Sequence, residues 1–557
     1  MNPPLERQLL GIIVGGSVDR GFQVRLNPDV PLEGINVGSQ IVVQGTDLVY
    51  FCIVTDVSLE AVDSRYRSIL PSTLNPFITE VTAGTVIYGT LQVSPMLTLP
   101  ASGKGQIQPA RSLPPPFSQV LVASDSDFEE VFGKESNTHF FIGTPLHRET
   151  KICLDIEKLM RRSTGVFGKS GTGKTFLTRL LLIGILKSNL ASTLVFDMQN
   201  EYGWSGTSEA GAGTVKGLKQ LFPSQVSIFS MDPENSKLRG AKTDFTVTIG
   251  LDEIEPEDIK VLQELLNLSD VAADAAYTVE AHYGQRVWIH TLLNLPSEGF
   301  SELARSLNIN EAALSALQRR LRRLERFDFV VKEADKTPKG GTVRSILDYL
   351  ERGFHVVLEF GGYQDNRTAY ILVTNLLTRR IYNEYRARTE AAMGNRGNEP
   401  RPLVITIEEA HRFLTPQLAS QTIFGTIARE MRKYHVNLLV VDQRPGRIDS
   451  EVMSQLGTKI TCSLDDGKDV DSILSGVSGR RDLRSVIETL SDNREALILG
   501  HAIPMPTVIR TREYGSNDSY KSLGQSPPTL NGQILVGDDT GKPNTREFDL
   551  LFGSSSD

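Results

Sequence analysis

The sequence predicts an α/β fold with a doubly wound, mostly parallel sheet, preceded by a small β-barrel and interrupted by a helical insertion. Three observations predict it. From about Lys151 onward, apolar runs of strand length alternate with helical patterns, as in parallel sheets covered by helices. A glycine-rich loop joins one of these strands to the helix that follows it. The first hundred residues instead hold short alternating strands separated by Gly, Asp and Asn turns, which favours a small barrel or sandwich.

Composition excludes several classes of protein. The 557 residues are 39% hydrophobic, enough for ordinary globular cores. No apolar run approaches the roughly 18 residues of a membrane span. Cys52, Cys153 and Cys462 are isolated, so neither a disulfide framework nor a zinc site is indicated. The net charge of −8 argues against a broadly basic nucleic-acid coat but is compatible with a locally basic DNA channel. We expect a cytoplasmic protein without membrane insertion.

The N-terminal β region is expected to span residues 1–98. Apolar and polar residues alternate over 22–26, which indicates a strand with one buried face. Further strand-like runs occur at 9–14, 41–43, 50–54 and 87–93. A linker and connecting segment is expected over 99–150, where Pro and Gly residues are frequent at the start.

Residues 151–515 are expected to form the second domain. Its strand candidates are short apolar runs at 164–167, 193–196, 226–229, 356–359, 403–407 and 438–441. Between about 251 and 350 the pattern becomes helical, which indicates an insertion. Within it, residues 300–327 fit either a helical subdomain with a solvated basic face or a helix-turn-helix with an Arg-rich second helix. The tail over 516–557 is rich in Gly, Ser, Asp and Pro and is expected to be flexible.

The glycine-rich loop matches a phosphate-binding pattern. Residues 168–175 fit G-x-x-x-x-G-K-[ST] between a short strand and an apolar helix. Glycines let backbone N–H groups converge on phosphate oxygens at the helix N-terminus. Lys174 would reach the β- and γ-phosphates, and the Thr175 hydroxyl would ligate Mg²⁺. The candidate nucleotide-binding residues are Gly168, Lys169, Ser170, Gly171, Thr172, Gly173, Lys174, Thr175 and Phe176.

Another apolar strand, 403–407, ends in two adjacent carboxylates, Glu408 and Glu409. Nucleotide hydrolysis needs an acid that organises the metal and a residue that polarises water. Because side chains alternate in direction along a strand, we expect Glu408 to face Mg²⁺ and Glu409 to face the attacking water. Solvated acids at a strand end are the alternative. The presence of the phosphate loop in the same α/β pattern favours the catalytic role.

Acids also follow the strand after the phosphate-loop helix, namely Asp197 and Glu201. In an open α/β sheet, ligands bind beyond the carboxyl ends of the strands. Both acids are therefore candidates to lie near the γ-phosphate, where either would position water or bind an arginine of a neighbouring subunit. A helix cap is the alternative for Asp197.

Two further elements offer sensing and positive charge. Gln443 follows a third apolar strand, and its amide can both donate and accept hydrogen bonds, as a γ-phosphate sensor must. The helix before that strand places Arg429, Arg432 and Lys433 on one face. An arginine finger acting on a neighbour would come from this face. Basic residues that favour a helix C-terminus are the alternative. His411, after the carboxylate pair, is expected to be structural or coupling.

In this order, the motifs resemble the HerA family within the FtsK/HerA group of P-loop ATPases. The matching stretches are 168–175, 196–197 with 201–202, 407–411, 427–430 with 432–433, 442–445 and 496–500. The resemblance covers roughly residues 1–515 and agrees with a β-barrel, a RecA-like core and a helical insertion. The family usually has Asp where this chain has Glu408, and Gly where it has Asn200.

The resemblance implies an ATP-hydrolysing homo-hexamer, with ATP and Mg²⁺ bound between subunits and double-stranded DNA in the central channel. Family members often work with a NurA-like nuclease in DNA end processing, and related proteins act in bacterial defence. The implied residue roles are phosphate and Mg²⁺ binding by Lys174 and Thr175, catalysis by Glu409, sensing by Gln443, and a trans finger at Arg429 or Arg432.

We therefore expect an ATP-driven, ring-forming DNA translocase or helicase that serves DNA end processing, repair or defence with a nuclease or other effector. A P-loop motor that moves protein, or powers a secretion or conjugation machine, is one alternative. A nucleotide-gated scaffold with slow hydrolysis is another, and Glu408 in place of Asp keeps it open. DNA-stimulated turnover separates the first hypothesis from both alternatives.

Overall fold

The computed structural model describes residues 8–63, 86–102, 106–146, 148–207, 214–334, 341–393, 399–430, 433–477, 480–491, 494–524, 529–530 and 533–534. The chain divides into two compact units, Met1–Arg512 and Glu513–Asp557. In the second unit the described elements are α19 (Asn517–Gly524) and a hairpin of β24 (Thr529–Leu530) and β25 (Gln533–Ile534). Most of the tail that was expected to be flexible lies outside the described residues.

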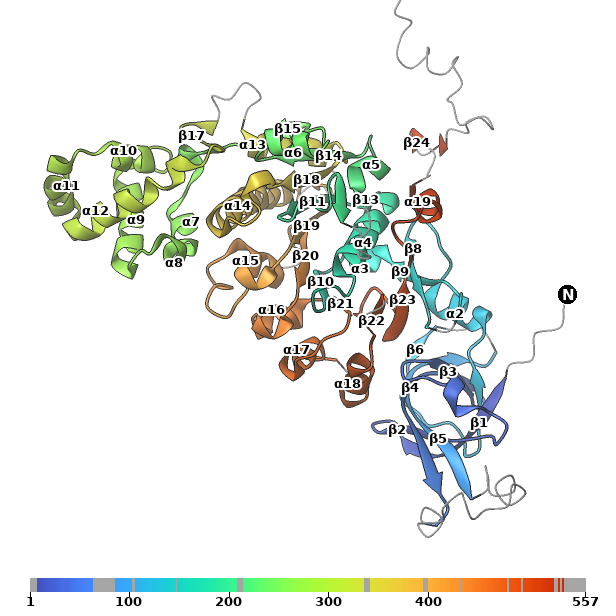
Figure 1. Cartoon of the computed structure of the whole chain (residues 1–557). Helices are drawn as coiled ribbons and strands as arrows, with labels where there is room; N and C mark the ends of the chain where they lie inside the picture. Colours follow the sequence, from blue (N-terminus) through green and yellow to red (C-terminus); the bar gives the residue numbers. More distant parts are fainter. Residues whose placement is uncertain are drawn as a thin grey trace, which may run out of the picture. The chain divides into compact units, whose positions relative to one another are not determined.

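Six strands of the first unit close into a barrel (Figure 1). They are β1 (Leu9–Ser17), β2 (Gly21–Leu26), β3 (Gln40–Gln44), β4 (Leu48–Ala61), β5 (Ile87–Pro100) and β7 (Gln119–Val122). The order is β2-β1-β7-β3-β4-β5, and β5 pairs back onto β2. Phe22, Val24 and Leu26 are buried, as their alternation with polar residues predicted. The predicted β-barrel is confirmed.

The strand β7 comes from a stretch that was expected to be linker. It pairs antiparallel with both β1 and β3, and so fills the gap between them. Four residues are too few to show a period-2 pattern, although Val120 is fully buried in the barrel core. The barrel therefore extends to Val122, at the end of β7. The short strand β6 (Gln108–Pro109), which precedes β7 in the chain, pairs with β5.

A 12-stranded sheet forms the core of the chain. Eight neighbouring strands are parallel, in the order β15 (Phe245–Thr246), β14 (Val226–Ser230), β18 (His355–Glu359), β11 (Ser192–Asp197), β19 (Leu403–Ile407), β20 (Val436–Asp442), β10 (Thr164–Phe167) and β21 (Thr458–Thr461). Four antiparallel strands extend it, in the order β22 (Glu495–Gly500), β23 (Thr507–Thr511), β8 (His139–Thr144) and β9 (Ile152–Asp155). All six strands predicted for this domain are present.

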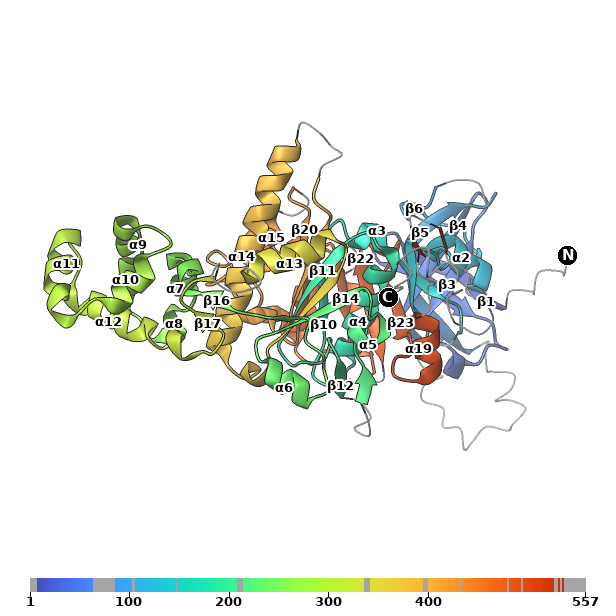
Figure 2. The same ribbon diagram turned by 90° about the horizontal axis from the view of Figure 1, so that it is seen from above.

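Helices cover both faces of the parallel strands, so the predicted α/β class is confirmed (Figures 1 and 2). In Figure 1, α4 (Lys174–Ser188) lies on one side, and α14 (Arg367–Ala392), α15 (Ile423–Glu430) and α16 (Ser450–Gln455) lie on the other. The remaining helices around the sheet are α3 (Ile156–Leu159), α5 (Leu218–Leu221), α6 (Pro233–Leu238), α13 (Thr342–Glu351), α17 (Gly467–Ile473) and α18 (Arg480–Glu488). The carboxyl ends of the parallel strands meet at one edge, where ligands bind in such sheets.

The helical insertion is a group of helices between β15 and β18. Its members are α7 (Pro256–Val261), α8 (Gln263–Leu266), α9 (Asp270–Tyr283), α10 (Trp288–Asn294), α11 (Phe300–Leu307) and α12 (Glu311–Leu321). A buried charge pair fixes it to α14, because Arg379 Nη2 donates to Asp258 Oδ2 at 2.7 Å. Asn375 of α14 donates to the same carboxylate and accepts from the backbone N–H of Ile423, where α15 begins. The insertion and α15 thus share one supporting helix.

The barrel contacts the sheet domain through β4 and α18. The Ser485 hydroxyl donates to the carbonyl of Thr55 at 3.0 Å. The connecting segment contains α2 (Asp125–Phe132), capped by Ser124, before β8 joins the large sheet. Over the described part of the chain, no helix combines the length and apolar character needed to cross a bilayer.

Candidate functional site

The phosphate loop connects β10 to α4 as the motif requires. All four residues of β10 are buried in the centre of the sheet, and α4 begins at Lys174. Gly171 and Gly173 have positive φ angles of 80° and 92°, which glycine adopts without a Cβ penalty. The Lys174 ammonium donates to the carbonyl of Lys169 at 2.7 Å, inside the loop. Burial lowers the pKa of Lys174, while nearby acids oppose this effect.

A cavity of about 340 Å³ opens beside the loop at the carboxyl ends of the strands. It is lined by Ser170, Gly171, Gly173, Lys174, Thr175, Phe176, Arg179, Gln199, Glu201, Glu408, Glu409, Val441, Asp442 and Gln443. Ten of the predicted site residues therefore lie together. Five others that the structure describes are not among the lining residues: Gly168, Lys169, Thr172, Asp197 and Arg429. Arg432 lies outside the described residues.

Glu408 follows β19 and is almost completely buried. The Tyr202 hydroxyl donates to Glu408 Oε1 at 2.9 Å, and the Tyr370 hydroxyl donates to the Glu408 carbonyl at 2.8 Å. Burial, followed by the charge of Asp197, raises the pKa of Glu408 to about 8. Glu408 Oε2 is buried and has no hydrogen-bond partner among the described residues. A cation at the cavity would satisfy this oxygen and favour the ionised carboxylate, so Glu408 fits a metal ligand.

The hydroxyl of Thr175 completes the donor set for a metal. Mg²⁺ is usually bound through one or two protein oxygens together with substrate phosphates and waters, and not by an all-protein cage. The described residues contain no group of three or more His, Cys, Asp or Glu side chains arranged to hold a metal ion. Thr175 and Glu408, which both line the cavity, fit Mg²⁺ bound together with a nucleotide.

Glu409 adopts the left-handed conformation, with φ 49° and ψ 44°. This conformation costs a non-glycine residue roughly 1–3 kcal/mol, and such strain gathers at functional sites. Gln443 Nε2 donates to Glu409 Oε1 at 3.1 Å, and His411 Nε2 lies 3.7 Å from Glu409 Oε2. The strained turn therefore sends the two adjacent acids into different surroundings, with Glu408 buried and Glu409 partly exposed beside Gln443.

His411 is held from behind by the buried carboxylate of Asp442. Asp442 Oδ2 accepts from the backbone N–H of His411 at 2.6 Å and lies 2.9 Å from His411 Nδ1. Asp442 Oδ1 accepts from the backbone N–H of Arg444. His411 thus lies between Asp442, at the end of β20, and Glu409.

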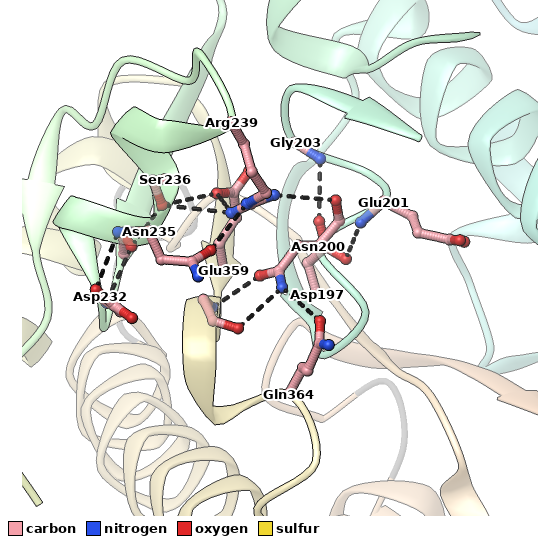
Figure 3. Close-up of polar contacts among 12 residues, drawn as sticks. Asp197, Asn200, Glu201, Gly203, Asp232, Asn235, Ser236, Arg239, Glu359 and Gln364 are labelled. Atoms are coloured by element: carbon pink, nitrogen blue, oxygen red, sulfur yellow. Dashed lines mark hydrogen bonds and ion pairs between the residues drawn. The ribbon is translucent and has the colours of Figure 1, made fainter. Parts of the chain in front are cut away.

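Asp197 holds a turn and does not line the cavity. Its carboxylate accepts backbone N–H groups from Glu201 at 2.8 Å, Tyr202 at 2.8 Å and Gly203 at 3.1 Å (Figure 3). The side chain is fully buried, and burial together with the nearby Glu359 raises its pKa to about 7. The alternative of a helix cap is not found, because no helix begins here and the next element is the strand β12 (Ser205–Thr207). By fixing the turn, Asp197 places Glu201 at the cavity and Tyr202 against Glu408.

A second polar network supports this turn from behind (Figure 3). Glu359, at the end of β18, pairs in register with Asp197 and is fully buried. Arg239 Nη2 donates to Glu359 Oε2 at 2.8 Å, and the Ser236 hydroxyl donates to the same oxygen at 3.1 Å. Burial raises the pKa of Glu359, and the contact with Arg239 opposes this shift. Three neighbouring strands therefore end in buried acids, at Asp197, Glu359 and Glu408.

Asn200 stands where the HerA family usually has Gly, and the structure shows how asparagine fits this position. Its φ is 57°, a conformation that glycine adopts freely and that asparagine tolerates better than most residues. Its side chain accepts from the backbone N–H of Gly361 at 2.8 Å and donates to the carbonyl of Gly361 and to Gln364 Oε1, both at 3.2 Å (Figure 3). Asn200 thus keeps the backbone shape of glycine and adds a link to the loop after β18.

We expect Asn200→Ala to destabilise the sheet domain by about 2–4 kcal/mol, because it adds left-handed strain and removes three hydrogen bonds. Asn200→Gly is the matched control, since it removes the hydrogen bonds without the strain. Thermal unfolding should give the order wild type, Asn200→Gly, Asn200→Ala, from most to least stable. Equal unfolding temperatures for the two variants would contradict the role of the backbone conformation.

Arg429 does not line the cavity of its own chain. Its Nε lies 3.0 Å from Glu451 Oε2 on α16, and its Nη1 donates to the carbonyl of Ala419. The side chain is 33% exposed. Of the described residues that line the cavity, none comes from α15.

Several residues of the site were missed by the sequence analysis. Arg179 lies one helical turn after Thr175, lines the cavity and donates to the carbonyl of Glu201. Its spacing from Thr175 was a usable signal, because residues four apart share a helix face. Tyr202 lies within a stretch that resembles the HerA family, but no role was predicted for it. The signal for Glu359 was its place at the end of an apolar strand, as for Glu408. Gln199 also lines the cavity, with no signal in the sequence.

The fold and the site together define a class of protein, a P-loop ATPase core of the RecA-like kind. Residues 140–381 match the family model of the central domain of helicase HerA. The DNA double-strand break repair helicase HerA of Pyrococcus furiosus is 26% identical over 436 residues, which are 73% of this chain and 75% of that protein. The HerA of Sulfurisphaera tokodaii is 24% identical over 71% and 73% of the two chains. The resemblance to the HerA family is confirmed.

Similar solved structures include VirB4 of Thermoanaerobacter pseudethanolicus, with 13% identity and a TM-score of 0.44, covering 70% of this chain and 100% of that chain. The plasmid coupling protein TrwB in complex with ADP and Mg²⁺ has 13% identity and a TM-score of 0.41, over 70% and 98% of the two chains.

Proposed function

We propose that this protein is an ATP-driven DNA translocase or helicase that hydrolyses ATP between the subunits of a ring. The observation that supports hydrolysis is that one cavity is lined by all five of these side chains: Lys174, Thr175, Glu408, Glu409 and Gln443. These side chains supply phosphate binding, metal ligation, water activation and a hydrogen-bonding sensor, which is the set that phosphoryl transfer to water requires.

Each residue has one role in this proposal. Lys174 leaves the carbonyl of Lys169 and donates to the β- and γ-phosphates. Thr175 and Glu408 hold Mg²⁺, whose charge offsets that of the phosphates. Glu409 orients the attacking water and accepts its proton, and its own orientation comes from Gln443. Tyr202 keeps Glu408 in place through its hydroxyl. The preorganised contacts reduce the reorganisation needed when charge develops on the γ-phosphate.

DNA as the track is supported by the similarity to relatives named DNA double-strand break repair helicases. We propose a homo-hexamer with double-stranded DNA in the central channel, working in end processing, repair or defence with a NurA-like nuclease or another effector. In this ring, Arg429 or Arg432 reaches the nucleotide of the neighbouring subunit.

The first experiment measures steady-state ATP hydrolysis by the assembled protein with and without linear double-stranded DNA, at two salt concentrations. We expect stimulation by DNA that weakens at the higher salt, because phosphate contacts release counterions. Hydrolysis that DNA does not stimulate would contradict DNA as the track and favour a motor for protein. Nucleotide-dependent assembly with negligible turnover would favour a scaffold.

The trans role of Arg429 is tested with two inactive variants. Arg429→Ala should lower turnover by roughly 10³-fold or more, the size typical of removing an arginine finger. Mixing it with Lys174→Ala should restore part of the activity, because Arg429 of one subunit serves the intact loop of the next. Glu451→Gln is the control, since it removes only the ion-pair partner of Arg429 and should keep turnover. Full activity of Arg429→Ala would assign the finger elsewhere.

A further inference from the structure

The helical insertion contains a helix-turn-helix at α11 and α12 (Figure 1). The first helix ends at Asn308, whose φ of 55° reverses the chain. Asn310 caps the second helix by accepting backbone N–H groups of Ala312 and Ala313 at 2.8 and 3.3 Å. Both interpretations of residues 300–327 are therefore partly right, because the helix-turn-helix is present and belongs to the helical subdomain.

Four exposed arginines follow one another on the outer side of α12 and its extension. Arg319, Arg322, Arg323 and Arg326, the arginine face, have the spacing i, i+3, i+4 and i+7, which places them on one side of a helix. Arg322 and Arg323 keep helical backbone angles beyond the end of α12. The opposite side packs into the insertion through the buried residues Leu314, Leu317, Gln318, Leu321 and Leu324.

The arginine face lacks acidic partners within the described residues. None of its four side chains takes part in an ion pair there, and the contact of Arg322 is with the carbonyl of Leu293 at 3.1 Å. Arg386 elsewhere is paired with Glu390, whereas the exposed Arg305 and Arg344 also have no ion pair within the described residues. The arginine face differs in that four such side chains lie together. Glu325 stands three positions after Arg322, a spacing at which helix side chains are neighbours, but no ion pair joins the two within the described residues. Positive charge therefore accumulates on one surface of a chain whose net charge is −8.

We propose that the arginine face binds the phosphate backbone of duplex DNA, independently of sequence. Seven residues of helix span roughly 10 Å, which suits several phosphates of one strand. Arginine forks match phosphate oxygens bidentately.

The chemistry around the face favours a nucleic-acid backbone over other partners. A protein interface of ordinary strength has aromatic or aliphatic anchors at its centre. Over residues 288–334 and 341–392, the structure has no exposed large hydrophobic side chain, whereas Val271, Tyr277 and Val287 are exposed in the preceding part of the insertion. Base reading is also disfavoured, since a recognition helix contacts bases with its N-terminal residues, and those of α12 are Glu311, Ala312 and Ala313.

This inference deepens the proposed function, because it rests on DNA being the track. The test compares wild type with the triple variant Arg319→Gln, Arg323→Gln, Arg326→Gln. The matched control is Arg161→Gln, Arg386→Gln, Arg388→Gln, which removes the same charge from exposed arginines that have acidic partners. Binding of two linear duplexes of unrelated sequence is measured by fluorescence anisotropy over a series of salt concentrations. Turnover without DNA and thermal unfolding show that each variant is folded.

We expect the triple variant to bind both duplexes more weakly, with a salt slope reduced by about 0.9 for each phosphate that it no longer neutralises. The control should behave as wild type. An unchanged slope in the triple variant, with wild type binding normally, would overturn the arginine face while leaving the proposed function intact. Polyglutamate that competes as well as DNA at equal charge would overturn the phosphate assignment in favour of an acidic protein. Wild type that neither binds DNA nor responds to it in turnover would overturn the proposed function itself.

Discussion

We expect Lys174→Ala to weaken nucleotide binding by about 100-fold or more and to abolish turnover, because it removes two charge-assisted hydrogen bonds to phosphate. The acidic residues around Lys174 increase the expected loss of nucleotide binding. Glu201, Glu408 and Glu409 line the same cavity, so removing the ammonium leaves a negative site facing a negative ligand. Isothermal titration with ATP and Mg²⁺ measures the effect directly.

The matched control is Lys169→Ala. Lys169 belongs to the same loop, but its ammonium lies 3.1 Å from Asp465 and its side chain does not line the cavity. This variant should retain nucleotide binding close to that of wild type, because the backbone N–H of the loop is unchanged. Tight ATP binding by Lys174→Ala would remove the loop from the proposed site.

We expect Glu409→Gln to retain ATP binding and to lose turnover by roughly 10²–10⁴-fold, the usual contribution of a positioned general base. Glutamine has the same shape and can keep a hydrogen bond with Gln443, but it accepts no proton from water. Binding should be preserved, since Glu409 is partly exposed and no phosphate-binding group is removed. Single-turnover hydrolysis with a separate binding measurement distinguishes the two effects.

Glu408→Gln provides the contrast. Its carboxylate is buried with one oxygen held by Tyr202, so the neutral variant should fold well and instead weaken Mg²⁺-dependent nucleotide binding. Opposite patterns in the two variants support separate roles for the adjacent acids. Normal hydrolysis by Glu409→Gln would refute its assignment as the catalytic residue.

Local patterns in the sequence predicted many of the residues that line the cavity. The phosphate loop is contiguous, and Glu408, Glu409 and Gln443 stand directly after apolar strands. Parallel strands bring their carboxyl ends to one edge, so residues at such positions converge without knowledge of the side-chain contacts. The structure places the loop and all three side chains at one cavity.

Other parts depend on contacts between distant segments. The Tyr202 hydroxyl reaches Glu408 across 206 residues of sequence, and Arg239 reaches Glu359 across 120. The hydrophobic periodicity of a sequence does not predict contacts between residues so far apart in the chain. Asp197 shows the same limit, because its position at a strand end suited a ligand role equally well, and only the three backbone N–H groups around it reveal a turn-holding role.

The sequence by itself determined the α/β class, the phosphate loop and the acidic strand ends, because each is encoded by residues close together in the chain. Tertiary structure decided which acid is buried, which residue holds each acid, and that Arg429 does not line the cavity of its own chain. It also decided that the arginine face has no ion pair within the described residues. The physical reason is that burial and pairing depend on the neighbours which packing supplies, and the sequence does not name those neighbours.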